Sequence, residues 1–353
     1  MQIKSSSDGD GLKTAAYLIV LLWGLAEAKS FFIPLCLAGL LGFLMAPLHQ
    51  LLRKHLRIPE VLSIALSAVV MVSPLFLVGY LLVRQGQGLV QDFPHLMQSG
   101  QEHLTAFTRG SLGMRLGMEK FEVQDVFQKV SSGAGEGLAF VVGGLAALLN
   151  AGSQGALILI FSILMLASRV QLRRSGERIL SRSASFRETR LLDDVVSLIQ
   201  HFLTARMLIV GIIGGLSAAA LAIFGLKYSV FLGALLGVFT LVPAVGFIIA
   251  LIPTLAVAIA TGHSLGSILG MVACLVVFNL LEGNYLTPKM VGSRLNINAL
   301  SSFVGLFAGG LMWGVWGMFL SVPILGVIRI CFNAVPALQP WSELLADRES
   351  PEN

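Results

Sequence analysis

Long apolar runs alternate with short polar segments along most of this chain. A helix needs about 20 apolar residues to cross a bilayer, and the longest runs reach or exceed that length. The pattern predicts spans near residues 15–26, 31–48, 59–83, 138–167, 202–224, 229–260, 264–281 and 299–332. We therefore expect an all-α polytopic membrane protein with about eight transmembrane helices.

Two of the predicted spans contain residues that interrupt a regular helix. Pro243 lies inside 229–260 and has no backbone N–H, and Gly314 and Gly317 lie inside 299–332. Backbone groups freed at membrane depth are tolerated only against protein or a water-filled cavity, and transporters build sites from such broken helices. We expect both helices to be broken or kinked, with a simple proline kink as the alternative at Pro243.

A polar stretch, residues 84–137, separates the third and fourth spans. Its apolar residues recur at helical spacing, so it predicts amphipathic helices that are too polar to span. They fall into two groups: Leu89, Val90, Phe93, Leu96 and Met97, then Phe121, Val126, Phe127 and Val130. This insert is expected on the membrane surface, against partner subunits, or as a small water-exposed helical subdomain.

The pattern divides the chain into six parts. They are residues 1–83 with the first three spans, 84–137 with the insert, 138–168 with the fourth span, 169–201 as a basic loop, 202–335 with the last four spans and the candidate transport site, and 336–353 as a polar tail.

Composition and charge support a protein embedded in a bilayer. The chain of 353 residues is 56% hydrophobic and 12% charged, whereas soluble domains carry about 25% charged residues. The net charge of +5 fits cytoplasmic loops, and no nucleic-acid binding is expected. Residues 169–194 hold seven arginines, which predicts that this loop and both termini are cytoplasmic and that the insert is outside.

The amino terminus allows a second interpretation. Lys4 and Lys13 precede an apolar run, and Ala26 and Ala28 form the A-x-A pattern of a signal-peptide cleavage site. The next apolar run begins at Phe31, which leaves almost no exported segment between them. We therefore favour a first span that is retained.

Sequence motifs for catalysis are missing. The chain has no P-loop and no HExxH motif, which argues against an ATP-driven pump and a zinc protease. Cys36, Cys274 and Cys331 lie far apart in apolar runs without metal-ligand spacing. We expect no enzyme activity, no cofactor and no metal site.

The polar stretch Phe278–Asn298 is the main candidate for function. Glu282 ends an apolar run, and a carboxylate at the edge of hydrocarbon is costly enough to suggest a functional role. The alternative is an interfacial glutamate that caps the next segment or pairs with Lys289 or Arg294. Counting spans places this stretch at the outer face, unless it re-enters the membrane. The candidate pathway residues are Glu282, Asn279, Asn284, Pro288, Lys289, Pro243, Gly246 and Pro253.

Small residues in the last span favour close helix packing. Glycines four residues apart let helix backbones approach each other in apolar surroundings. The candidate packing residues are Gly305, Gly309, Gly310, Gly314 and Gly317.

Three segments in order carry a family resemblance. They are LVPAVG at 241–246 with Pro253, LEGNYLTPKMVG at 281–292, and the glycines from Gly309 to Gly317 followed by Pro323. Together they resemble the autoinducer-2 exporter family of bacterial membrane permeases. The chain departs from that pattern at Phe247, where the family often has proline, and at Asn298 and Ala299, where a His-Pro pair is common.

The resemblance implies a transporter of the bacterial inner membrane. Members are described as exporters of autoinducer-2 or as sodium or lithium/proton antiporters. Export of a small polar solute is our leading expectation, and antiport through Glu282 is the alternative. A non-transporting scaffold whose insert binds a partner is a third hypothesis. The expected partners are membrane lipids, the solute, protons or sodium or lithium ions, and further copies of the chain in a homo-oligomer.

Overall fold

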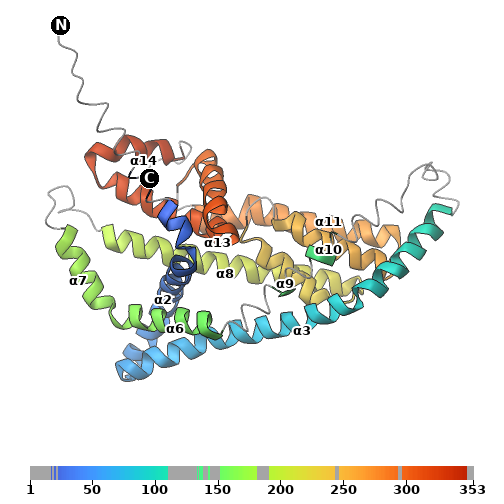
Figure 1. Cartoon of the computed structure of the whole chain (residues 1–353), viewed down its shortest axis with the longest axis horizontal. Helices are drawn as coiled ribbons and strands as arrows, with labels where there is room; N and C mark the ends of the chain where they lie inside the picture. The colour runs from blue at the N-terminus through green and yellow to red at the C-terminus, as the bar shows by residue number, and fades with distance from the viewer. Residues whose placement is uncertain are drawn as a thin grey trace, which may run out of the picture. The chain divides into compact units, whose positions relative to one another are not determined.

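The fold is helical throughout the part of the chain that the structure describes. This computed structural model (Figure 1) describes residues 23–109, 152–180, 191–242, 246–292 and 296–347, with Tyr17, Val20, Gly133, 135–137 and 142–143. Within those residues the only β-type pairing is an isolated antiparallel bridge between Ile297 and Ala346. The predicted all-α class is confirmed.

The helices belong to two compact units. In chain order they are α2 (Lys29–His55), α3 (Glu60–Arg109), α6 (Gly152–Ala167), α7 (Arg169–Leu180), α8 (Leu191–Ile223), α9 (Ser229–Phe239), α10 (Gly246–Ala260), α11 (Leu265–Leu281), the π-helical turns η3 (Glu282–Leu286) and η4 (Pro288–Gly292), α13 (Ala299–Asn333), the 3-10 turn η5 (Pro336–Leu338) and α14 (Gln339–Leu345). Unit 1 comprises residues 1–65, 156–200 and 295–353, and unit 2 comprises 66–155 and 201–294.

Five described helices are long and apolar enough to cross a membrane. A sixth results if the bent pair α6 and α7, which meet at 65°, counts as one span. The predicted spans at 31–48, 59–83, 202–224, 264–281 and 299–332 each fall on one of the five. The predicted count of eight is not reached in the described chain, partly because 229–260 forms two short apolar helices.

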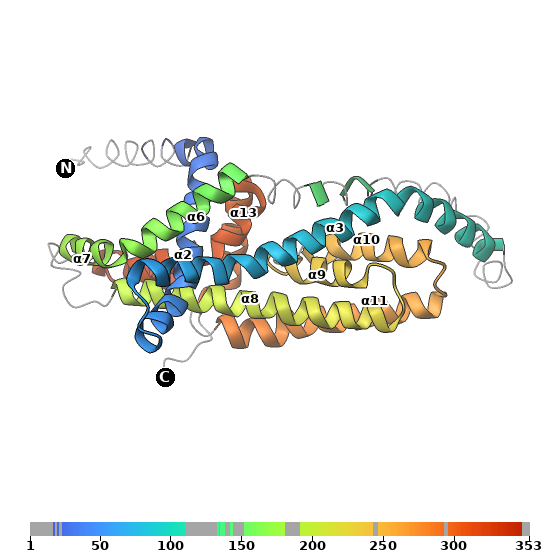
Figure 2. The same ribbon diagram turned by 90° about the horizontal axis from the view of Figure 1, so that it is seen from below.

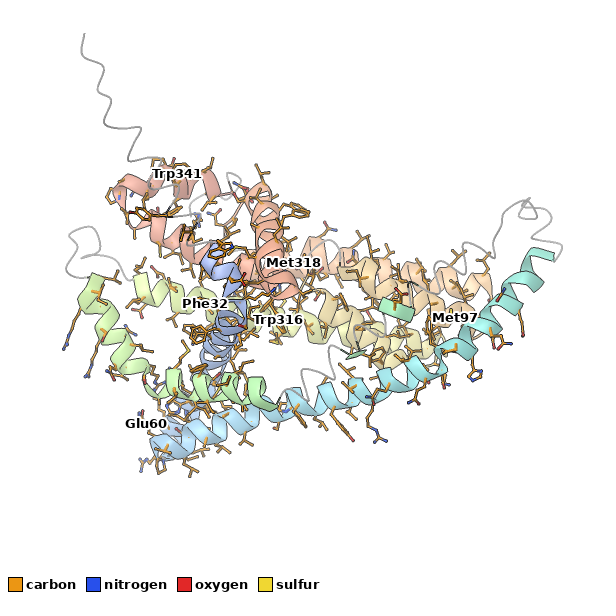
Figure 3. The ribbon with its side chains drawn as sticks, in the orientation of Figure 1. Phe32, Glu60, Met97, Trp316, Met318 and Trp341 are labelled. Carbon is orange, nitrogen blue, oxygen red and sulfur yellow. The ribbon has the colours of Figure 1, made fainter. Side chains whose placement is uncertain are left out.

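Polar bonds tie the helices of unit 1 together. Ser162 of α6 donates a hydrogen bond to the carbonyl oxygen of Ala38 on α2 at 3.0 Å. The indole N–H of Trp313 on α13 donates to the carbonyl oxygen of Leu25 at 3.0 Å. Figure 3 draws the side chains of these helices. Each bond satisfies a polar side chain that would otherwise lose hydration among apolar neighbours.

Helix α13 folds back on itself at Gly314. Trp313 and Gly314 leave helical geometry, and Gly314 has φ 61° and ψ −140°, a backbone conformation that side-chain-bearing residues rarely adopt. Gly305 lies against Leu325, although residues this far apart along a straight helix would be about 30 Å apart. The predicted break in this span is confirmed, and it is a reversal of direction.

Glycines form the contact between the two halves of α13. Gly309 and Gly317 face each other so closely that a Cβ on either would meet the other's backbone, and Gly310 lies against Met318. After the second half, the chain returns to the first residue of the helix. The side-chain amide of Asn298 donates to the carbonyl oxygen of Leu344 at 2.7 Å, and its backbone N–H donates to that of Leu345 at 2.9 Å.

Unit 2 has a continuous apolar core. Its buried residues come mainly from α3, α8, α9, α10 and α11, which lie side by side in Figure 2. Helix α3 continues beyond residue 83 to Arg109, so the third predicted span and the start of the insert form one helix. Leu89 and Phe93 are buried in the core, and Val90 packs against it. The first amphipathic group therefore packs within its own chain, while the second group lies outside the described residues.

A polar cluster joins α3 to the turn between α8 and α9. The Lys227 ammonium contacts Asp92 Oδ2 at 2.6 Å, and the Tyr228 hydroxyl donates to the same oxygen at 2.6 Å. Tyr228 has φ 64° and precedes α9, so the turn places both groups beside Asp92. Its hydrogen bond to Asp92 raises the pKa of Lys227, which favours the charged form.

Candidate functional site

The polar stretch after α11 continues as a helix. Helix α11 begins at Ser264, whose hydroxyl caps it by accepting from the Ser267 N–H. It then passes into η3 and η4, so that an apolar helical run covers Leu265–Val291. Pro288 has no N–H to offer the preceding turn, and wider π-helical turns are a common response to such interruptions at functional sites.

Glu282 begins η3 and forms a buried ion pair. Its Oε1 lies 3.2 Å from Nη1 of Arg206 on α8, and the two side chains are 15% and 6% exposed. The Thr287 hydroxyl donates to the same carboxylate oxygen at 2.7 Å. Charges this deeply buried are stable only when they are paired and hydrogen-bonded, and this pair meets both conditions.

Arg206 also reaches the break between α9 and α10. Its Nη1 donates to the carbonyl oxygen of Thr240 at 3.4 Å, just after α9 ends. Thr240 has no continuing helix to satisfy that carbonyl, and the guanidinium supplies the donor. One arginine thus connects the broken helix to the π-helical turn.

The break itself depends on a close backbone contact. Gly246 begins α10 and lies so near the Phe239 carbonyl that a Cβ would clash with it. The predicted break in 229–260 is confirmed, although Pro243 lies outside the described residues. Pro253 is buried within α10, where the helix continues past it.

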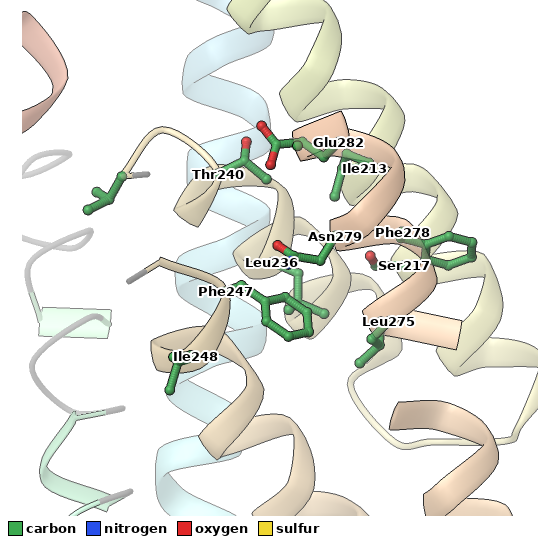
Figure 4. A pocket seen from close by; sticks show the side chains of 12 residues that line it. Ile213, Ser217, Leu236, Thr240, Phe247, Ile248, Leu275, Phe278, Asn279 and Glu282 are labelled. Carbon is green, nitrogen blue, oxygen red and sulfur yellow. The ribbon is translucent and has the colours of Figure 1, made fainter. Parts of the chain in front are cut away.

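A cavity of about 370 Å³ lies beside the ion pair. It is lined by residues of α8, α9, α10, α11 and η3, and Figure 4 shows the side chains that border it. Most of the wall is apolar. The polar groups are Ser217, Thr240, Asn279 and Glu282. In Figure 4 the Asn279 amide and the Phe247 ring border the same space. The site therefore offers hydroxyl, amide and carboxylate groups within an otherwise apolar enclosure.

The predicted pathway residues separate into two sets. Glu282 and Asn279 line the cavity, and Gly246 lies one residue before its wall at Phe247. Asn284, Pro288 and Lys289 are exposed and do not line it. Asn284 donates to the carbonyl oxygen of Leu280 at 3.0 Å.

Lys289 is not the partner of Glu282. Its ammonium donates to the Tyr285 hydroxyl at 2.9 Å and lies 5.0 Å from that ring's centroid. Arg294, the other partner considered from the sequence, lies outside the described residues. The described partner of Glu282 is Arg206, in a helix far earlier in the chain.

The polar site residues that the sequence interpretation missed are Arg206, Ser217, Thr240 and Thr287. Arg206 belongs to the helix that also contributes Ile213 and Ser217 to the cavity wall. It lies well inside α8, the only Lys or Arg between Leu191 and Ile223, and that isolation was a usable signal. Ser217 is 1% exposed in the cavity wall.

Comparison with known families gives a match over nearly the whole chain. The profile described as AI-2E family transporter matches residues 15–337. The chain belongs to the AI-2E transporter family. The AI-2E match spans both units and includes every residue of the cavity. The chain is accordingly a membrane protein of a transporter family, as its sequence pattern predicted.

Individual AI-2E relatives have low sequence identity to this chain, but two of them align over most of its length. The chain is 24% identical over 330 residues to the AI-2 transport protein TqsA of Escherichia coli K12, covering 94% of this chain and 93% of TqsA. It is 24% identical to YueF of Bacillus subtilis, covering 86% of this chain and 84% of YueF. YrrI of B. subtilis is 30% identical over a shorter stretch, 41% of this chain and 40% of YrrI.

The site offers no cluster of metal ligands in the described part of the chain. No group of three or more His, Cys, Asp or Glu side chains is close enough there to hold a metal ion. The chemistry of the cavity is suited to binding a small molecule. It presents hydrogen-bonding groups in an apolar enclosure, with a paired charge at one edge.

Proposed function

We propose that this chain is a permease that exports a small polar solute, with autoinducer-2 or a similar molecule as the transported compound. Membership of a transporter family and the extensive similarity to the AI-2 transport protein TqsA support this proposal. The observation that carries it is the cavity with Glu282 at its edge. Its volume of about 370 Å³ lies within the range of small-molecule sites.

The Arg206–Glu282 pair acts as the gate of that cavity. Arg206 connects the α9/α10 break to the π-helical turn, which are the two irregular segments of the site. Neither charge tolerates separation without a substitute partner, because an unpaired buried charge costs several kcal/mol. A solute hydroxyl or water that replaces these bonds therefore releases both segments together, and closure restores the pair.

Antiport of sodium or lithium against protons is the second candidate. It is favoured by the single carboxylate in the cavity wall. Export ranks higher because the Glu282 charge is already paired with the Arg206 guanidinium and hydrogen-bonded by the Thr287 hydroxyl, so a cation must first displace Arg206. The scaffold hypothesis ranks last, since the family's members are named as transporters.

The location and assembly of the protein are part of the proposal. The arginines of α7 support a cytoplasmic position for that helix by the positive-inside rule. We place the protein in the bacterial inner membrane as a homo-oligomer with both termini cytoplasmic. Opposite compartments for reporters fused to the two termini would contradict this placement.

Flux in reconstituted vesicles tests the proposed function. Vesicles with the wild-type chain should release preloaded autoinducer-2 faster than protein-free vesicles, and Glu282→Gln should abolish the difference. Asn284→Ala is the matched control, because Asn284 lies in the same π-helical turn outside the cavity wall. Equal release with and without protein would refute export of this compound.

The same vesicles distinguish antiport. Sodium or lithium added to vesicles that hold a pH gradient should leave the gradient unchanged if the chain is only an exporter. A collapse of the gradient that depends on Glu282 would instead establish the second candidate.

A further inference from the structure

A second cavity lies in unit 1, apart from the proposed transport site. It has a volume of about 490 Å³ and lies between α2, α6, α7 and the first turns of α8. Its wall on α2 and α6 is formed by Gly39, Gly42, Phe43 and Met165, and its other end by Arg169 and Arg173, with Asp193 paired to Arg173. We call it the α2/α7 groove. One end is apolar and the other is cationic.

Small residues create the apolar end. A Cβ on Gly39 would touch the Met165 side chain at 3.7 Å, and a Cβ on Gly42 would lie 3.6 Å from the Ser162 carbonyl oxygen. The missing side chains leave a channel along helices that already contact each other through Ser162 and Ala38. The apolar lining of this space matches the chemistry of an acyl chain.

The cationic end has one arginine available. Arg173 is occupied, since it pairs with Glu177 at 2.9 Å and with Asp193 at 2.9 Å. Arg169 is partly buried and has no ion pair or hydrogen bond within the described chain. It begins α7 at the 65° bend that follows the apolar helix α6. A bend from an apolar helix into a basic one is typical of the boundary between hydrocarbon and headgroups.

We propose that the α2/α7 groove binds one anionic phospholipid, with its phosphate at Arg169 and an acyl chain along Gly39 and Gly42. A soluble anion would satisfy Arg169 but leave the apolar wall uncovered, whereas the phosphate of a zwitterionic lipid is already balanced by the ammonium group of its own headgroup. Only an amphiphile with a negative headgroup satisfies both ends. Basic pockets between membrane helices bind anionic headgroups in the same way.

Lipid titration of the purified full-length protein in neutral detergent tests this proposal. Native mass spectrometry would count bound phosphatidylglycerol, with phosphatidylcholine as the zwitterionic comparison that carries no net charge. Arg169→Gln should weaken phosphatidylglycerol binding about fivefold or more, which corresponds to roughly 1 kcal/mol for one basic residue at a headgroup. Arg174→Gln removes the same charge from an exposed position of the same helix outside the groove, so its affinity should equal that of wild type.

Three results would overturn the proposal. Equal weakening by Arg169→Gln and Arg174→Gln would mean diffuse attraction to a basic helix. Equal binding of phosphatidylcholine would remove the role of charge. Competition by glycerol phosphate at the same concentration as the lipid would mean that the groove holds a soluble anion.

A variant at the apolar end provides an independent test. Gly39→Leu should reduce phosphatidylglycerol binding by filling the channel, without affecting weak binding of inorganic phosphate. Should this variant fail to fold, the two arginine variants still decide the question. None of these measurements uses flux, so the result is independent of which solute the protein transports.

Discussion

Two long apolar runs are interrupted in the described part of the chain, and both interruptions include a close glycine contact, but only the one in unit 2 is also bridged by a charged side chain. In unit 2 the break between α9 and α10 is satisfied by charged and hydroxyl groups, with Arg206 reaching the Thr240 carbonyl. In unit 1 the reversal within α13 is stabilised by glycine packing, with Gly309 against Gly317.

This difference suggests that the α9/α10 break is part of a functional site and that the α13 reversal has a structural role. A polar interruption contains groups that a solute or water can replace, so it can change state. An interruption closed by backbone contact alone, as in α13, has no polar group that a solute or water can replace, and an added side-chain atom disrupts it. We therefore assign the moving part of the molecule to the first kind, and each of the following variants tests that division.

The largest effect is expected at the ion pair. Arg206→Gln leaves the Glu282 carboxylate buried without its partner, which should lower the free energy of unfolding by about 3–5 kcal/mol. The double variant Arg206→Gln/Glu282→Gln should recover most of that loss and still show no flux. Unfolding in mixed micelles measures the first quantity and vesicle release the second. A double variant as unstable as the single one would show that the pair is not the coupled unit.

The next largest effect is expected within α13. In Gly317→Ala the new methyl group would meet the Gly309 backbone, so the halves must separate at a cost of about 1–3 kcal/mol. Gly211→Ala on α8 is the control, because nothing lies within 4 Å of its added Cβ, and it should be neutral or stabilising by up to about 1 kcal/mol. Similar unfolding midpoints for the two variants would contradict the packing role of Gly317.

A smaller effect distinguishes stability from function. Thr287→Val removes the hydroxyl that donates to Glu282 and should cost about 1 kcal/mol of stability. Thr254→Val removes a buried hydroxyl that donates to the Ala250 carbonyl within α10, at a similar cost. Only Thr287→Val should alter solute flux. The gate assignment fails if the two variants change flux equally.

The smallest effect is expected at the exposed cluster on α3. Asp92→Asn should leave the unfolding temperature almost unchanged, because the partners are largely exposed and the pair is screened by salt. The hydrogen bond raises the pKa of Lys227 above its ordinary 10.5. The stability that this interaction contributes is therefore fully present below pH 10.5, and it is lost as the pH rises through the higher pKa of the folded state. Thermal unfolding at neutral pH should therefore show no dependence on this lysine's titration. A loss comparable to that of Arg206→Gln would make the cluster a second buried site.

The sequence predicted local features of the site more reliably than its partners. Glu282 and Asn279 were recognisable because polar groups are costly inside an apolar run, and that cost can be judged from neighbouring residues. Arg206 pairs with Glu282 from a different helix, and nothing in either local pattern indicates the register that brings them together. Arg206 is recognisable as unusual because it is the only Lys or Arg in α8, but this does not indicate which residue it pairs with.

The limits of the fold prediction have a similar physical origin. Hydropathy located five of the long helices, because burial in hydrocarbon requires continuous apolar residues. It also treated the polar stretch at Glu282 as an interruption, whereas π-helical turns carry the helix through it. Glycines marked the break in α13, but whether a helix bends or reverses depends on one pair of backbone angles at Gly314.

The reversal at Gly314 changes how the ends of the chain are assigned to the two faces of the membrane. A run that returns to its starting point adds no crossing, however many apolar residues it contains. Asn298, which begins α13, is hydrogen-bonded to the residues of α14 that follow it. We therefore expect the chain to enter and leave this element in one compartment, so that the segments before Asn298 determine which face the carboxyl terminus reaches. Accessibility tags placed at Asn296 and after Asp347 should be labelled from the same face.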